Sequence, residues 1–179
     1  QDPQPAGGGI FKPEWFVHLY EEPPILATLL TIDTAETDKN YNDATVFSFW
    51  GVYWIEEVGV PTRILGLHWL DCHEIRVQPK DLEPEFRDFY AKCLQHPVQP
   101  RLAAIEKKST GVTLHSVLQN FRGLNVIDIP RNKSSGSKTQ RYLEMQSLIA
   151  SRRVSFTVNA QHADLCITQA KKITVNNTR

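Results

Sequence analysis

Short hydrophobic runs along the chain predict a sheet that opens with three consecutive strands. Residues 25–33 form an apolar run that is too short for a typical helix and suits a buried central strand. Residues 44–55, rich in Val, Phe, Trp and Tyr, predict a second strand, and residues 63–77 a third, with a turn over residues 59–61. Further strands are expected at residues 102–106, 124–129 and 154–157, the last of them at an edge of the sheet.

Helical periodicity separates the later strands. Residues 81–94 place Leu82, Phe86, Phe89 and Leu94 on roughly one face, which predicts an amphipathic helix. Further helices are expected at residues 111–121, 138–150 and 160–172. This order of elements predicts an α/β fold, a mixed sheet flanked by helices whose opening strands are antiparallel.

The first 24 residues differ in composition from the rest. They are rich in Pro and Gly, and Pro23-Pro24 would stop any helix just before the first predicted strand. We interpret residues 1–24 as a linker that follows an upstream part of a longer protein, with aromatic side chains that pack onto a neighbouring surface. Residues 25–179 then form a single domain.

Charge and composition narrow the class of protein. The 20 Lys and Arg residues balance the 20 Asp and Glu residues, so no global basic field indicates a protein that coats DNA. A nuclease remains compatible, because an acidic cluster would offset a local basic patch. No run is long enough to span a membrane, and the chain does not open with a signal peptide. Three cysteines without framework spacing favour reduced thiols in a cytosolic compartment.

Three acids in distant segments are candidate metal ligands. Asp33 and Glu106 each lie at the downstream end of a predicted strand, and Asp164 lies at the start of the closing helix. A carboxylate at a strand end has rigid support and faces solvent. Three such acids that meet at one sheet edge would suit a pair of hard divalent cations and hence phosphoryl-transfer chemistry on nucleic acid. The alternative for each is a solvated surface carboxylate, and Asp43 and Asp128 are reserve candidates expected in turns.

Five segments, in order, resemble the nuclease domain of the large terminase subunit of tailed bacteriophages, which has a ribonuclease-H-like fold. Residues 8–16 resemble the segment that joins the ATPase to the nuclease, and residues 31–35 resemble the first nuclease motif. Residues 105–111 resemble the second motif, an acid followed shortly by Gly at a helix start. Residues 138–156 resemble the Asp-Lys-x-x-Arg helix with its following strand, and residues 162–164 resemble the closing His-Asp-Asp.

Two positions depart from this pattern. Ser137 stands where the helix motif has an Asp, and Ala163 replaces the first Asp of the closing motif. The resemblance therefore carries three acids onto this chain, Asp33, Glu106 and Asp164.

The resemblance implies a metal-dependent endonuclease that cleaves double-stranded DNA during viral genome packaging. Two Mg²⁺ or Mn²⁺ ions are implied, with Asp33 bridging them, Glu106 holding one and Asp164 the other. The implied partners are double-stranded DNA, an upstream ATPase domain of the same polypeptide, the small terminase subunit and the portal protein. The implied location is the host bacterial cytoplasm, with no membrane partner.

Basic residues near these motifs are candidate phosphate contacts. We expect Lys107, Lys108, Lys138 and Arg141 to contact the DNA backbone. The alternative is that these residues form an ordinary solvated surface with no ligand. His162 could assist proton transfer or bind a phosphate, or could be a helix-terminal residue with no catalytic duty.

Three alternative functions remain open from the sequence. One is another ribonuclease-H-like enzyme, such as a junction resolvase. Another is a catalytically inactive module that binds DNA or docks to the portal. The third is a structural domain with no role on nucleic acid. Cys72, His73, Cys93 and His96 lack the tight paired spacing of zinc modules, so we do not expect a zinc site there.

Overall fold

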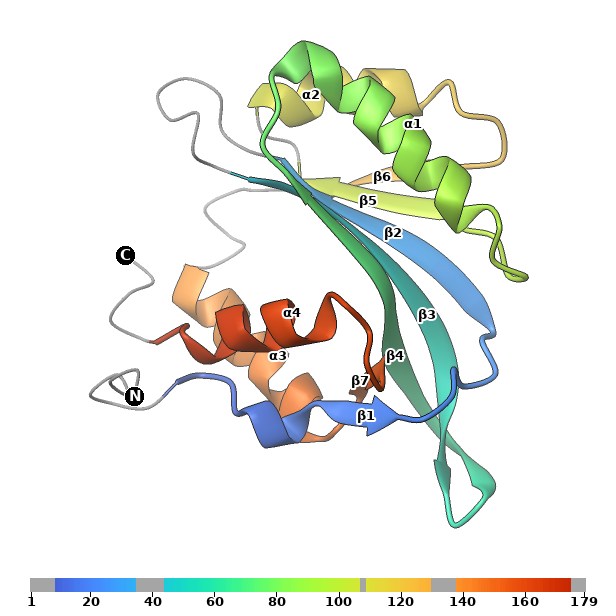
Figure 1. The fold of residues 1–179 in the computed structure, drawn as a ribbon, viewed down its shortest axis with the longest axis vertical. Helices are drawn as coiled ribbons and strands as arrows, with labels where there is room; N and C mark the ends of the chain where they lie inside the picture. The colour runs from blue at the N-terminus through green and yellow to red at the C-terminus, as the bar shows by residue number, and fades with distance from the viewer. Residues whose placement is uncertain (1–8, 35–43, 107–108, 130–137, 175–179) are drawn as a thin grey trace. The chain divides into compact units, whose positions relative to one another are not determined.

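The computed structural model describes residues 9–34, 44–106, 109–129 and 138–174. Seven strands pair in the order β1-β7-β4-β3-β2-β5-β6 (Figure 1). They are β1 (Val17–Leu19), β2 (Ala27–Asp33), β3 (Thr45–Glu57), β4 (Val60–Ile75), β5 (Leu102–Glu106), β6 (Asn125–Ile129) and β7 (Val154–Thr157). The helices are α1 (Leu82–Cys93), α2 (Ser109–Leu118), α3 (Lys138–Ala150) and α4 (Ala163–Lys171), with short 3₁₀ turns η1 (Pro13–Trp15) and η2 (Pro79–Asp81).

Within the described residues the chain forms two compact units. The central unit comprises residues 25–34, 44–52, 69–106 and 109–129, and the terminal unit comprises residues 9–24, 53–68 and 138–174. Strands β3 and β4 have residues in both units. No helix among the described residues is both long and apolar enough to cross a membrane.

The central unit is built around strand β2. It pairs antiparallel with β3 and parallel with β5, which in turn pairs parallel with β6. Alternate residues of these strands enter a hydrophobic core with helix α1, where Phe47 meets Phe86 edge-on with ring centroids 5.4 Å apart. The predicted mixed sheet with antiparallel opening strands and flanking helices is therefore confirmed.

The sequence of helix α1 has charged residues at its two ends and an apolar face that suit a helix on the core. Pro79 lies in the turn that precedes it, Glu83 and Glu85 occupy its first turn, and Lys92 occupies its last, an arrangement that complements the helix dipole. Its buried side chains recur at helical spacing and close the core over the strands: Leu82, Phe86, Phe89, Tyr90 and Cys93.

The terminal unit includes part of the segment that we interpreted as a linker. Strand β1 pairs parallel with β7, and the Ile10 N–H donates to the Ile173 carbonyl at 2.8 Å. The rings of Phe11 and Phe16 are buried, as expected for aromatics that pack onto a surface, whereas Tyr20 is 90% exposed. The position of the domain boundary at residue 24 stays a prediction.

Two details of the predicted sheet were wrong. Strand β7 is not an edge strand, because β1 pairs with its outer side and β4 with its inner side. The turn between β3 and β4 lies at Val58 and Gly59, both with positive φ (52° and 74°), and Val60 already belongs to β4. Positive φ at both central residues gives a hairpin turn whose twist matches the flanking strands.

A buried histidine joins β4 to β7 inside the terminal unit. His68 is 1% exposed, and its two ring nitrogens lie 2.8 Å from Ser155 Oγ and 3.0 Å from Thr157 Oγ1. Burial lowers the pKa of His68 from 6.5 to about 4. The neutral ring has one donor and one acceptor, and the two hydroxyls can satisfy both.

Candidate functional site

Two of the three predicted acids end neighbouring strands of the central unit. Strands β2 and β5 are parallel, and their last register pair joins Ile32 to Ile105. Asp33 and Glu106 are the next residues and the final residues of the two strands. The carboxyl ends of parallel neighbours meet at one edge of a sheet, so the fold brings these two acids together at that edge.

Both acids belong to the sheet face that points away from the hydrophobic core. Ile32 and Ile105, 2% and 0% exposed, are core residues. Because side chains alternate along a strand, the residues that follow them take the opposite face. Asp33 is exposed and Glu106 is half-buried. The backbone of Asp33 is held by pairing with β3, and that of Glu106 by pairing with β6; we call these two residues the acidic pair.

Asp164 lies in the other unit. It occupies the first turn of α4 and is exposed. Within the described ranges, no group of three His, Cys, Asp or Glu residues lies close enough to hold a metal ion. The participation of Asp164 alongside the acidic pair thus stays a prediction.

The reserve acid Asp128 has another role. It lies within β6, not in a turn, in register with Ile105. This register assigns it to the core-side face, where its carboxylate is 2.8 Å from Nε2 of the largely buried His115. Asp128 therefore ties β6 to helix α2 and faces away from the acidic pair.

Of the remaining predicted site residues, some lie outside the described residues and the others lie on or beside helices α3 and α4. Asp43, Lys107 and Lys108 lie outside the described residues. Lys138 begins helix α3, and Arg141 lies one turn later and is half-buried. His162 is the residue before α4, and its ring centroid lies 5.6 Å from that of Phe156.

The acidic pair fits a hard divalent cation. Carboxylate oxygens are the ligands that Mg²⁺ and Mn²⁺ prefer, and Mg²⁺ characteristically binds through one or two protein carboxylates and keeps several waters. Soft metal ions would instead need thiolate ligands, which the cysteines of the central unit would have to supply. Burial raises the pKa of the Cys93 thiol to about 12, which keeps it protonated. The Ser48 hydroxyl lies 3.8 Å from Cys72 Sγ.

The sequence analysis does not identify a pair of stacked tryptophans that contacts the strand of Asp33. Trp50 stacks on Trp69 with ring centroids 4.2 Å apart, and its Nε1–H donates to Thr31 Oγ1 at 3.0 Å. Thr31 precedes Asp33 by two residues and so shares its face of the sheet. The available signal was the pair of tryptophans in adjacent predicted strands, and the register of those strands was needed to relate them to Asp33.

Comparison with solved structures identifies proteins of the same fold. The large terminase of a thermophilic bacteriophage is 10% identical with a TM-score of 0.58, over 90% of this chain and 37% of that one. The P22 large terminase nuclease domain is 10% identical with a TM-score of 0.52, over 88% and 75% of the two chains. The large terminase nuclease of thermophilic phage G20c, solved with bound magnesium, is 16% identical with a TM-score of 0.50, over 89% and 79%.

The TM-scores of 0.50 to 0.58 show that this chain shares the fold of these terminase nucleases, in agreement with the predicted fold class. This chain spans 37% of the length of the first of those proteins. No protein-family profile matches the sequence. No curated protein matches it either.

Proposed function

We propose that this chain is a metal-dependent endonuclease that cleaves double-stranded DNA during viral genome packaging. The observation that carries the proposal is the acidic pair, Asp33 with Glu106, at the ends of two adjacent parallel strands. The likeness to solved terminase nucleases, one of them with bound magnesium, supports the same reaction class.

In this proposal the three predicted acids hold two Mg²⁺ or Mn²⁺ ions. Asp33 would bridge the ions, Glu106 would hold one directly or through water, and Asp164 would hold the other. Bound by these acids, two such ions would supply activation of a water and stabilisation of the leaving oxygen for an in-line displacement at phosphorus.

The chain itself contributes fixed placement of charge. Strand pairing holds the backbone of Asp33 and Glu106, so their carboxylates need little reorganisation to receive a cation. The Thr31–Trp50 hydrogen bond and the Trp50–Trp69 stack stiffen the segment that leads to Asp33. Cationic side chains would position the phosphate backbone without reading sequence, and we propose this role for Lys107, Lys108, Lys138 and Arg141.

The remaining context is proposed by analogy with the terminase fold. The partners would be an upstream ATPase domain of the same polypeptide, the small terminase subunit and the portal protein, in the cytoplasm of a bacterial host. His162 and Asp43 would be auxiliary groups at the site.

The test is cleavage of supercoiled plasmid by the purified chain with Mn²⁺, Mg²⁺ or EDTA. Asp33→Asn and Glu106→Gln should each abolish nicking, whereas Asp88→Asn, an exposed acid of α1, is the matched control and should not. Near-normal nicking by Asp33→Asn would remove Asp33 from the site. A strong preference for branched DNA would favour a junction resolvase, and DNA binding without cleavage under either metal would favour an inactive docking module.

A further inference from the structure

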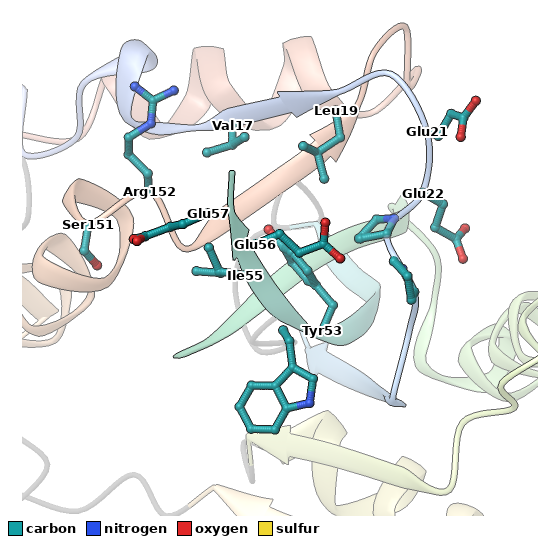
Figure 2. Close-up of a pocket in the computed structure, with 13 residues that line it drawn as sticks. Val17, Leu19, Glu21, Glu22, Tyr53, Ile55, Glu56, Glu57, Ser151 and Arg152 are labelled. Atoms are coloured by element: carbon teal, nitrogen blue, oxygen red, sulfur yellow. The ribbon is translucent and has the colours of Figure 1, made fainter. Parts of the chain in front are cut away.

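The terminal unit contains an open groove that no part of the proposed nuclease site uses. Its volume is 560 Å³, within the range of about 300 to 1,000 Å³ typical of ligand pockets. Apolar residues of two segments line it, among them Val17, Leu19 and Ile55 in Figure 2. They are Val17 and Leu19 of β1, Pro23 and Pro24 after it, and Trp54 and Ile55 of β3. Trp54 is 40% exposed, so part of its indole surface is accessible to a ligand.

The rim of the groove is acidic. Among the described residues that line it, four are glutamates and one, Arg152, is a cation, an excess of three negative charges. All four glutamates are exposed: Glu21, Glu22, Glu56 and Glu57. In Figure 2, Glu21 and Glu22 lie at one end of the groove and Arg152 at the other, with Glu56 between them. The negative potential is therefore strongest at the end that Glu21 and Glu22 form.

We propose that this groove docks a basic segment of a partner protein, one in which an apolar side chain is flanked by lysine or arginine. The apolar walls would bury the central side chain, and the carboxylates would pair with the flanking cations. The exposed face of Trp54 would add a cation–π contact. Duplex DNA does not suit the groove, because its phosphates would face the excess of carboxylates.

Arg152 is the cation of the groove, and its replacement tests whether charge determines binding. It follows helix α3 with a φ of 58°, a left-handed conformation in which glycine has no steric cost. Arg152→Gly therefore removes the positive charge from the groove and relieves the backbone at the same time. A basic ligand should bind this variant more tightly than it binds the natural chain, and an acidic ligand more weakly.

The probe is a fluorescein-labelled peptide, GRKLRKG, titrated with the whole chain and followed by fluorescence anisotropy. The double variant Glu56→Gln/Glu57→Gln should weaken binding about tenfold, from the loss of two partly screened ion pairs. The matched control is Glu14→Gln/Glu144→Gln, which removes two exposed carboxylates from outside the groove and should leave binding unchanged. The peptides GEELEEG and GRKSRKG should bind more weakly than GRKLRKG, because each lacks one half of the proposed recognition.

Equal weakening by the groove variant and its control would overturn the proposal, since it would mean that only net charge matters. Equal binding of GRKSRKG would overturn the role of the apolar walls. Plasmid cleavage should be unaffected by the groove variants, so failure here is distinct from failure of the proposed nuclease.

Discussion

Asp33 and Glu106 end neighbouring parallel strands one residue beyond the register pair Ile32–Ile105, on the sheet face away from the core. Two acids in adjacent positions on one face repel each other when both are ionised, and a bound cation removes that repulsion. The relationship therefore links the metal chemistry of the proposed site to the stability of the central unit.

Neutralising Asp33 should relieve this repulsion. We expect metal-free Asp33→Asn to melt no lower than the natural chain, and to lose most of the stabilisation by Mn²⁺. For the natural chain that stabilisation would be roughly 2.7 kcal/mol at a hundredfold excess over the dissociation constant. Thermal unfolding with and without Mn²⁺ measures both effects, with Asp88→Asn as the control. A destabilised metal-free variant with a normal response to Mn²⁺ would show that Asp33 is structural.

Binding of duplex DNA by the chain should be weak and dependent on salt. With no net charge, we expect a dissociation constant of about 10⁻⁴ to 10⁻⁶ M and little sequence preference. Lys138→Ala/Arg141→Ala should weaken binding and reduce the slope of log K against log salt by about 2, roughly one per lost phosphate contact. The control is Lys80→Ala/Arg63→Ala, two exposed cations. An unchanged slope in the first variant would mean that the phosphate contacts lie elsewhere.

The acidic pair could be predicted because its strands carry local signals. Residues 27–33 and 102–106 are apolar runs that end in an acid, and a strand end needs no knowledge of distant partners. Strand β1 could not be found in this way, since three residues carry no measurable alternation and its partner β7 is distant in sequence. The same missing partner explains why the sequence alone predicts β7 at an edge of the sheet. The relation of Asp164 to the acidic pair depends on packing that no local pattern encodes.

The hydrogen bond between Trp50 and Thr31 should contribute measurably to stability. Trp50→Phe keeps an aromatic ring for the Trp69 stack and removes the Nε1–H donor, and Thr31→Val removes the acceptor with little change in shape. The coupling free energy between the two changes should be about 0.5 to 1.5 kcal/mol, the usual net value of such a bond. Urea unfolding of the two single variants and the double variant measures it. Strict additivity would show that Trp50 acts through packing alone.

His68 should make the terminal unit sensitive to acid. Burial lowers the pKa of His68 to about 4, with the Glu22 carboxylate raising it and His162 lowering it by smaller amounts. Between this value and the ordinary value of 6.5, the unfolded chain binds a proton that the folded chain excludes. The contribution of His68 to stability is therefore complete above pH 6.5 and is lost as the pH falls toward 4, by at most about 3 kcal/mol. The test is the melting temperature measured as a function of pH. His68→Gln should flatten its fall over this window, whereas His18→Gln, at an exposed position, should not. If the melting temperatures of the natural chain and of His68→Gln fall in parallel, His68 does not carry the acid sensitivity.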